Sequence, residues 1–317
     1  MNFSICNKEL QYLNKFFQNY ALTLHYKKYI IFIIMKKYYF ICKNLICIDA
    51  EYFPDDNPVR AQFETEGGDA DINITCKICN ELPEVPQNSR KTGEFIISSE
   101  GNTIYRALPM GTAPGALTVY SADNTSRSET YFTHKSFPIM ADSRFMWSSV
   151  SLAQLLLGRN AFFMHSSFIS ANGKAILFSA ASGTGKSTQA ALWEKYRDAE
   201  VINGDKAGVL VEDGIYACGV PFCGTSGICK NKTFPLGAIV LLSQAPENTA
   251  RRISGIEAIQ RVLNNIYLDM IAPNEQTAIV DLLIELLKTV PVYSFGCTAD
   301  ENAVITLEEE LRNGGVI

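Results

Sequence analysis

Several features that would indicate common classes of protein are missing from this sequence. Its 28 basic and 33 acidic residues give a net charge of −5, so it lacks the basic excess of proteins that grip nucleic acid without regard to sequence. Its apolar run from Tyr29 to Met35 is shorter than the roughly 20 residues that a membrane-spanning helix needs. No small-residue cleavage site of a secretory signal follows that run. We therefore expect a protein with no nucleic-acid partner and no stable membrane span.

The cysteines lack the pattern of a disulfide framework. Nine cysteines, an odd number, are scattered through 317 residues, which predicts mostly reduced thiols in a cytoplasmic protein. Cys76 and Cys79 form a single CxxC without a second pair, and neither His25 nor His134 lies at zinc-finger spacing. We interpret this pair as unligated thiols, with half of a zinc site or a redox pair as the alternatives.

Length and composition indicate a folded chain with more than one core. The chain has 317 residues, of which 47% are hydrophobic and 19% charged, close to the globular average. We predict a leader over residues 1–34, a smaller β-rich N-terminal domain over 35–150, and an α/β domain over 151–317. The leader is read as an extension upstream of a true start at Met35, with a lysine-flanked peripheral membrane helix as the alternative.

The first half of the chain contains short β-like runs and no catalytic constellation. Turn residues such as Gly67-Gly68 and Asp123-Asn124 separate these runs, which cover residues 39–48, 93–98, 102–108 and 116–120. Residues 148–157 then have helical spacing, with Gly158 as the stop.

After residue 160, strands alternate with helices, which predicts an α/β domain. One strand is expected over 161–171, then a hairpin turn at Asn172-Gly173 and an apolar strand over 175–179. Further strands are expected over 201–203, 207–211, 214–217, 236–242 and 292–295, and helices over 186–196, 255–268, 277–289 and 303–312.

One motif in the sequence indicates a phosphate-binding site. Residues 180–188 read AASGTGKST and fit the Walker A form [AG]xxxxGK[ST], placed between an apolar strand and a helix. Glycines let the backbone N–H groups of such a loop converge on a phosphate, toward which the next helix directs its positive end. The nucleotide-binding residues predicted for ATP are Ala181, Ser182, Gly183, Thr184, Gly185, Lys186, Ser187 and Thr188. Lys186 is expected to reach the β- and γ-phosphates, and the Ser187 hydroxyl is expected to coordinate Mg²⁺.

Phosphoryl transfer also needs a carboxylate, and Asp205 is the candidate. It follows the short strand over 201–203, at the edge where an α/β sheet binds ligands, so we predict that it binds the metal or accepts the proton of the attacking hydroxyl. An ordinary turn at Asn203-Gly204-Asp205 is the alternative. His165 lies in an apolar strand, where a single histidine is more often a core residue than a catalytic one.

Together, His165, the loop core Ser182 to Ser187 and Asp205 resemble the catalytic domain of HPr kinase/phosphorylase and its serine-kinase relatives. The resemblance covers about residues 160–290 and implies a P-loop α/β fold shared with phosphoenolpyruvate carboxykinase. It also implies a catalytic trio in which Asp205 is the general base, His165 assists it and Lys186 holds the phosphates, with phosphoserine as the product. The same resemblance is compatible with a homo-oligomer.

The sequence departs from this family in two places. Gly204-Asp205 stands where the HPr enzymes carry paired aspartates, and their EIRGxG element is missing, the nearest stretch being residues 215–219. These departures argue against HPr as the substrate and against phosphorolysis. Lys230 or Arg251 could supply the positive charge that the missing arginine leaves out.

The form of the domain, with GKSTQAALW after the loop and APEN after a later strand, is similar to kinases associated with ribosomal-peptide maturation. That similarity implies a serine of a protein or precursor peptide as acceptor, recognised with the help of the β-rich domain. Two other functions stay open: a nucleotide-binding accessory or sensor protein without transferase activity, and a kinase of a small metabolite.

Overall fold

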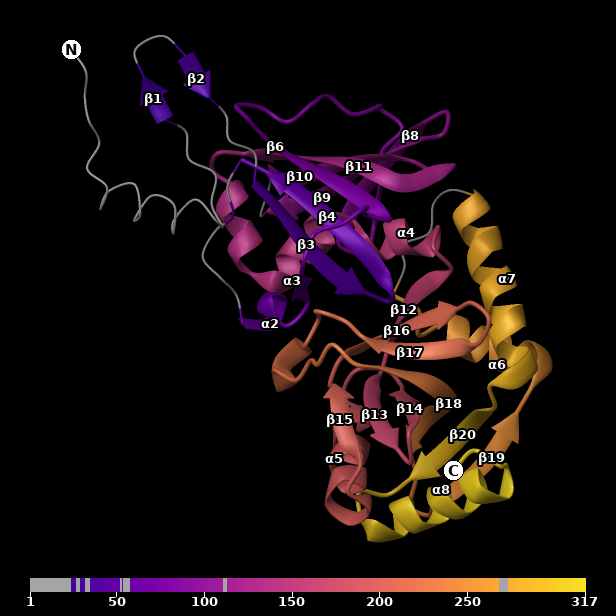
Figure 1. Ribbon diagram of the computed structural model, residues 1–317. Helices are drawn as coiled ribbons and strands as arrows, with labels where there is room; N and C mark the ends of the chain where they lie inside the picture. Colours follow the sequence, from indigo (N-terminus) through magenta and orange to yellow (C-terminus); the bar gives the residue numbers. More distant parts are fainter. Residues whose placement is uncertain are drawn as a thin grey trace, which may run out of the picture.

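The computed structural model describes residues 24–26, 29–31, 35–51, 53, 58–110, 113–267 and 273–317. It is a mixed α/β structure with two nine-stranded sheets, one above the other in Figure 1. Most of the expected leader lies outside the described residues. The parts of it that are described form an antiparallel pair, β1 (Leu24–Tyr26) and β2 (Tyr29–Ile31), so a peripheral helix through residues 29–31 is wrong.

The N-terminal sheet begins with a hairpin where the sequence predicted one strand. β3 (Met35–Ile41) and β4 (Asn44–Ala50) pair antiparallel around a turn at Cys42 and Lys43. Both turn residues have positive φ, 50° and 57°. The turn escaped the sequence analysis because neither residue is a glycine, asparagine or aspartate, which usually mark such backbone.

The rest of this sheet is mostly antiparallel, with β6 running parallel to both β4 and β11. Its strand order is β5-β3-β4-β6-β11-β10-β9-β8-β7. The elements are α2 (Pro58–Ala61), β5 (Glu64–Thr65), β6 (Ile72–Cys79), β7 (Arg90–Thr92), β8 (Phe95–Glu100), β9 (Thr103–Met110), β10 (Ala113–Ser121) and β11 (Asn124–Thr133). Cys76 and Cys79 are three residues apart on β6, so their side chains lie on opposite faces of the strand and do not converge on one ion.

Two short helices cover the inner face of the N-terminal sheet, after the 3-10 turn η1 (Phe137–Ala141). The sequence predicted one helix over 148–157, but α3 (Ser143–Ser149) and α4 (Leu152–Leu157) are separate. The break falls at Ser151, which has the left-handed φ of 55° and ψ of 38°. Hydrophobic periodicity continues across the break, which is why the pattern alone did not reveal it.

The C-terminal sheet follows the order β12-β16-β17-β18-β14-β13-β15, with β20 added beside β18 and β19 beside β20. Its strands are β12 (Ala161–His165), β13 (Ser167–Ala171), β14 (Lys174–Ser179), β15 (Glu200–Asn203), β16 (Lys206–Val211), β17 (Ile215–Gly219), β18 (Thr233–Gln244), β19 (Thr249–Ile253) and β20 (Val292–Cys297). The helices are η2 (Gly224–Ser226), α5 (Lys186–Arg197), α6 (Gly255–Leu263), α7 (Pro273–Thr289) and α8 (Glu301–Asn313). The alternation of strands and helices expected after residue 160 is confirmed.

The expected strand over 161–171 is two strands, because the chain changes partners at Ser166. β12 pairs with β16, whereas β13 pairs with β14 and β15. The hairpin turn at Asn172-Gly173 is confirmed, with positive φ at both residues. The break leaves His165 at the end of β12, facing the start of β16 rather than the middle of a continuous strand.

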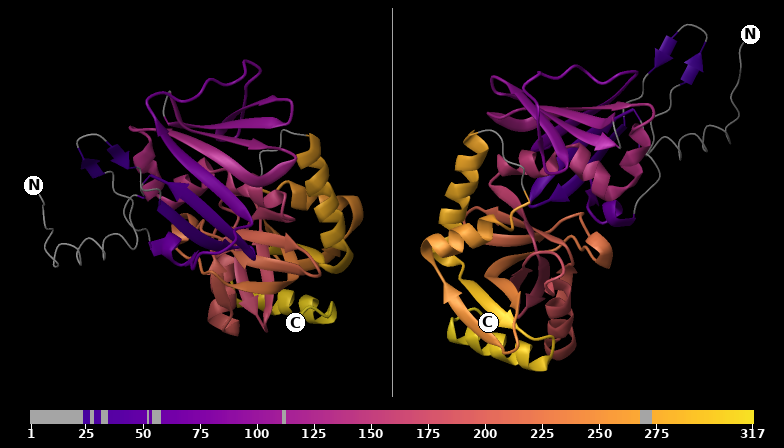
Figure 2. Two further views of the ribbon diagram at one scale, coloured as in Figure 1. Left: turned by 45° about the horizontal axis from the view of Figure 1, so that its top comes forward. Right: turned by 180° about the vertical axis from the view of Figure 1, so that it is seen from behind.

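Helices pack on both faces of the C-terminal sheet (Figure 2). Alternate residues of β14 enter two different cores: Ile176 and Phe178 pack with α5 and α8, while Leu177 packs with α6 and α7. A third core joins the inner face of the N-terminal sheet to residues of β12, β16 and β17. Among the described residues, no helix has the length and apolar character needed to cross a membrane.

Candidate functional site

The predicted phosphate loop connects β14 to α5. Lys174–Ser179 is almost entirely buried, and the helix starts at Lys186 directly after the loop. Gly183 and Gly185 have φ values of 79° and 120°, which L side chains rarely adopt. The N-cap of α5 is Gly185, so no side chain caps the first backbone N–H groups of this helix. The loop therefore has the strand, glycine turns and helix start that the sequence predicted for an anion site.

Lys186 is folded over this loop. Its Nζ donates to the carbonyl oxygens of Ala180 and Ala181, at 2.8 and 3.3 Å. Burial lowers the pKa of Lys186, and the negative charge of Asp205 opposes that shift. Lys186 and Asp205 are thus close enough to interact electrostatically. Ser187 and Thr188 are exposed on the first turn of α5.

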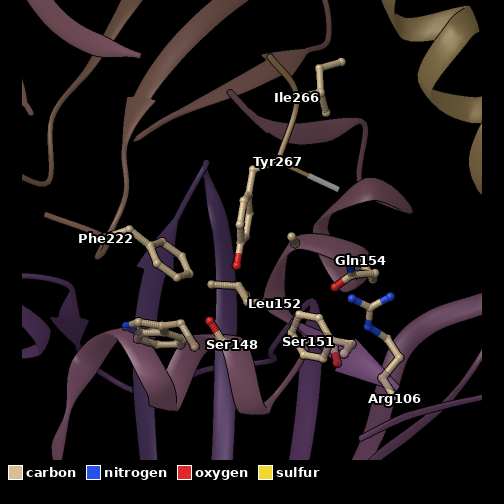
Figure 3. A pocket seen from close by; sticks show the side chains of 11 residues that line it. Arg106, Ser148, Ser151, Leu152, Gln154, Phe222, Ile266 and Tyr267 are labelled. Carbon is tan, nitrogen blue, oxygen red and sulfur yellow. The ribbon is translucent and has the colours of Figure 1, made fainter. Parts of the chain in front are cut away.

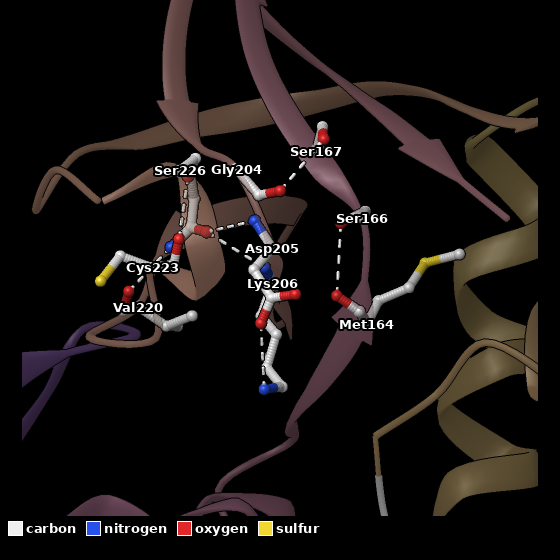
Figure 4. Close-up of polar contacts among 10 residues, drawn as sticks. Met164, Ser166, Ser167, Gly204, Asp205, Lys206, Val220, Cys223 and Ser226 are labelled. Carbon is white, nitrogen blue, oxygen red and sulfur yellow. Dashed lines mark hydrogen bonds and ion pairs between the residues drawn. The ribbon is translucent and has the colours of Figure 1, made fainter. Parts of the chain in front are cut away.

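Asp205 is held in a tight turn between β15 and β16 (Figure 4). The side-chain oxygen of Asn203 accepts hydrogen bonds from the backbone N–H groups of Asp205 and Lys206, at 2.9 and 3.0 Å. The other end of the same amide donates to Val220 O at 2.8 Å. Because Asn203 is fully buried, this arrangement fixes the turn from beneath. The aspartate is therefore a positioned residue rather than part of a loose surface turn.

The loop after β17 packs closely against this turn. A Cβ at Gly224 would lie 2.7 Å from the Cβ of Asp205, and one at Gly204 would lie 2.1 Å from Ser226 Oγ. Both positions are therefore restricted to glycine by close approach of the two segments. Ser167 Oγ donates to Gly204 O at 3.2 Å from the opposite side. Asp205 keeps 33% of its side chain exposed, so it stays accessible within this frame.

Lys206 is the cation that lies beside Asp205. Its Nζ is 3.2 Å from Asp205 Oδ2, and the residue is only 6% exposed. The ammonium group also lies 4.3 Å from the ring centroid of Tyr267 and 4.8 Å from that of Phe222. Two aromatic faces and one carboxylate compensate the burial of this charge.

The two cations that the sequence offered in place of the missing arginine each pair with a glutamate. Lys230 Nζ donates to Glu200 Oε1 at 2.9 Å, and Arg251 pairs with Glu257 at 2.6 Å. Whether either replaces the missing arginine stays a prediction, and the cation beside Asp205 is Lys206.

His165 lies at the edge of the same cluster. Its ring meets the Tyr267 ring edge-on, with centroids 5.3 Å apart. Burial lowers the pKa of His165, and the positive charge of Lys206 adds to this effect, while Asp205 and Glu94 oppose it. The histidine is therefore predominantly neutral at pH 7, which suits a hydrogen-bonding or proton-accepting group. Its backbone N–H donates to Asn265 O at 2.8 Å.

The structure thus brings His165, Lys186 and Asp205 within electrostatic range of one another, and it adds three residues that the sequence analysis did not single out. Lys206 and Asn203 lie within two residues of Asp205. Their polar side chains between two apolar strands could have indicated that they belong to the site. Tyr267 lies in the segment after α6, far along the chain, and no sequence pattern linked it to the site.

Two residues of the site, Ser187 and Asp205, are the candidates for holding a metal ion. Among the described residues, no group of three or more histidine, cysteine, aspartate or glutamate side chains converges as a metal cage. Mg²⁺ commonly uses only one or two carboxylates together with substrate phosphates, so Asp205 and Ser187 fit an ion that arrives with a nucleotide.

No protein-family model matches the sequence, and no curated protein matches it. Among solved structures, the chain is similar to the Hpr(Ser) kinase/phosphatase from Coxiella burnetii. The identity is 12% and the TM-score 0.28, and the alignment covers 48% of this chain and 89% of that chain. At this identity and TM-score, the likeness assigns no function to the present chain.

Proposed function

We propose that this protein is an ATP-dependent kinase that transfers the γ-phosphate to a hydroxyl group, that of a serine of a protein or precursor peptide. The observation that carries the proposal is the approach of the glycine loop and Lys186 to a carboxylate, Asp205, that a buried amide holds in place. Phosphoryl transfer requires phosphate binding and proton acceptance, and residues suited to each lie near one another.

In this mechanism the loop N–H groups and the start of α5 bind the phosphates. Lys186 leaves the carbonyl oxygens of Ala180 and Ala181 and turns to the β- and γ-phosphates, which are stronger partners for an ammonium group. A bound Mg²⁺, with Ser187 and Asp205 as its protein ligands, would neutralise developing charge on the phosphate oxygens.

Asp205 accepts the proton of the attacking hydroxyl. Its ion pair with Lys206 fixes the orientation of the carboxylate. Because phosphoryl transfer has a loose transition state with little bond formation to the nucleophile, orientation matters more than basicity at this step. His165, neutral and close by, assists in orienting the acceptor.

The experiment is a transfer assay with γ-labelled ATP and Mg²⁺, in which precursor peptides encoded near the gene are offered as acceptors. We expect label on serine with the native protein and none with Lys186→Ala, since that change removes the phosphate-binding ammonium group. ATP binding that leaves every acceptor unlabelled would instead favour the accessory or sensor function.

A kinase of a small metabolite is the second candidate, and one observation favours it. A partly polar cavity of about 120 Å³, lined in part by Phe222 and Tyr267, lies beside the candidate site (Figure 3).

A further inference from the structure

The segment between β17 and β18 is a compact loop that returns close to its own start. The backbone N–H of Gly219 donates to Lys232 O at 2.8 Å. A Cβ at Gly219 would lie only 1.8 Å from Lys230 O, so the two ends of the loop lie side by side. The short helix η2 lies between these ends. Compact surface loops whose ends meet in this way frequently carry function.

This loop is seated on the turn that holds Asp205. Near its start, Val220 O accepts a hydrogen bond from Asn203 Nδ2 at 2.8 Å, and near its end Cys229 forms an antiparallel bridge with the same asparagine. Between these two anchors, a Cβ at Gly224 would lie 2.7 Å from the Cβ of Asp205. Any shift within the loop therefore changes the surroundings of Asp205.

Two cysteines of the loop, Cys223 and Cys229, stand on either side of η2. Cys229 is 2% exposed within the core that joins the two sheets, and Cys223 is partly exposed at the edge of that core. Burial raises the pKa of Cys229 to about 12, and the charge of Cys223 and a hydrogen bond between the two side chains add to this shift. In Figure 4 the sulfur of Cys223 points away from Asp205. The two thiols are thus neighbours that are not bonded to each other.

Among the described cysteines, Cys223 alone combines a neighbouring thiol with access from solvent. Cys42 and Cys218 also interact with each other, but they are only 2% and 1% exposed. Cys79 is partly exposed, but its Sγ donates to Phe132 O at 3.2 Å, and burial alone raises its pKa. The remaining described cysteines are buried. Oxidants that select thiols by exposure therefore reach a thiol pair at Cys223.

We propose that Cys223 and Cys229 form a thiol oxidation site, and that the disulfide between them displaces the loop from Asp205. The co-reactant is a small hydroperoxide such as H₂O₂. The oxidation site stands on its own residues, whereas its effect on phosphate transfer rests on the kinase function proposed above. Oxidation slows transfer, and reduction of the disulfide restores it.

Oxidation begins at Cys223, the thiol that solvent reaches. Its thiolate attacks the O–O bond of the peroxide and becomes a sulfenic acid, while the released hydroxide takes up the proton that the thiol had lost and becomes water. The sulfur of Cys229 then attacks the sulfur of Cys223, the S–O bond breaks, and the Cys229 proton leaves with the hydroxide as a second water. Two thiols and one H₂O₂ thus give one disulfide and two waters, and two electrons pass from sulfur to the peroxide oxygens.

The disulfide moves the part of the loop that contacts Asp205. A disulfide brings two sulfur atoms to about 2.05 Å, closer than any non-bonded contact. Cys229 is buried and bridged to Asn203, so the exposed side of the pair moves, and Gly224 directly follows Cys223. A misplacement of about 1 Å near reacting groups can slow a reaction by about 10²-fold. The phosphate loop is a separate segment, so we expect slower transfer with ATP affinity unchanged.

The first measurement is the mass of the protein after exposure to H₂O₂ and alkylation of the remaining free thiols. The disulfide protects two cysteines from alkylation and lowers the mass by two hydrogen atoms. Trypsin leaves Cys218, Cys223 and Cys229 in one fragment, residues 207–230, so the fragment is sequenced by mass spectrometry to assign the bond. We expect the bond between Cys223 and Cys229.

Cys223→Ser is the test variant, because serine is close to cysteine in size and removes the thiol that peroxide attacks first. We expect it to transfer phosphate at the native rate and to keep that rate after peroxide treatment. Cys79→Ser is the matched control, since Cys79 is the other partly exposed cysteine among the described residues. This control and the native protein should each lose transfer by about tenfold or more on oxidation, and dithiothreitol should restore it.

Hydrogen exchange at residues 204–206 gives a second readout that does not require phosphate transfer. The backbone N–H of Gly204 donates to Ile228 O at 3.2 Å, across the contact between the turn and the loop. A displaced loop breaks this bond and exposes the turn to water. We expect exchange there to become severalfold faster in the oxidised native protein and to stay unchanged in peroxide-treated Cys223→Ser.

A disulfide between Cys223 and Cys229 that accelerates exchange supports the inference. A bond between other cysteines, or no disulfide under conditions that oxidise Cys79, would overturn it. It would also be overturned by a disulfide that leaves either the exchange or a measurable transfer rate unchanged. If the disulfide forms and exchange becomes faster, but the reduced protein transfers phosphate to no acceptor, the oxidation site stands and the kinase function fails.

Discussion

At the scale of single residues, the burial of Lys206 is the most unusual feature of the site. A lysine that is 6% exposed is rare unless paired, and here its partners are Asp205 and two aromatic rings. The sequence contained the residue next to the predicted base, yet its burial could not be predicted, because both rings come from loops that are distant in sequence. Asp205 itself was predictable because it follows a strand and a phosphate loop precedes it.

The change Lys206→Met tests this role. It keeps the length and the apolar contacts with Phe222 and Tyr267 but removes the charge that orients Asp205. We expect the transfer rate to fall on the order of 10²-fold, the usual size of a positioning effect on acid–base catalysis, with ATP affinity nearly unchanged. Lys206→Arg should restore part of the rate. A loss of ATP affinity that matches the loss of rate would assign Lys206 to nucleotide binding instead.

His165 gives a prediction for stability against pH. Burial places its pKa below the ordinary 6.5, so the unfolded chain binds a proton at a higher pH than the folded chain does. Its contribution to stability is therefore complete above pH 6.5 and is lost as the pH falls below that value toward the lower folded pKa. Urea unfolding at several pH values should show a smaller acid loss in His165→Gln than in the native protein. Identical slopes in the two proteins would contradict this assignment.

At the scale of elements, the sequence located the strand, loop and helix of the phosphate site well. Hydrophobic runs and glycines are local signals, and β14, α5 and the turn at Asn172-Gly173 depend on little else. The misses were breaks in apolar stretches, at Ser151 and Ser166, where tertiary contacts rather than local preference end an element. The hairpin turn at Cys42 and Lys43 was missed for another reason, because neither residue is of a type that usually marks left-handed backbone.

A comparison of Gly185 with Gly173 distinguishes a role in ATP binding from the effect of backbone strain alone. Gly185 and Gly173 both have positive φ, and a Cβ at either would meet no atom within 4 Å. Alanine at either position should cost stability by about 1 to 3 kcal/mol from backbone strain alone. Only Gly185→Ala should also weaken ATP binding, by about tenfold or more, because only that glycine shapes the phosphate loop. Calorimetric titration of both variants with ATP checks this, and equal affinity in the two would count against the loop as the nucleotide site.

At the scale of the whole molecule, a shared hydrophobic core crosses the boundary predicted between the two domains at residue 150. The core of the N-terminal sheet includes Phe163, Leu210 and Val220 from the C-terminal part, together with Trp147. A boundary between 150 and 151 would therefore cut through one hydrophobic cluster. Composition could indicate two sheets but not that they share a core, because that depends on packing between segments distant in sequence. The two-domain division stays a prediction.

The shared core predicts that both halves unfold together. Trp147 lies in the joint core, and Trp193 packs between α5 and the C-terminal sheet, so each single-tryptophan variant reports on one half. We expect urea unfolding followed by Trp147 and by Trp193 to give coincident midpoints, as a cooperative unit requires. Two separated transitions would show that the halves are independent domains.

The central claim is phosphate transfer assisted by Asp205, and single-turnover kinetics with Asp205→Asn test it most directly. The asparagine keeps the size and the turn held by Asn203 but removes the proton acceptor. With γ-labelled ATP, Mg²⁺ and an acceptor that the native protein labels, we expect ATP affinity within about threefold of native and a transfer rate lower by about 10² to 10⁴-fold. Native transfer rates in this variant would contradict the account.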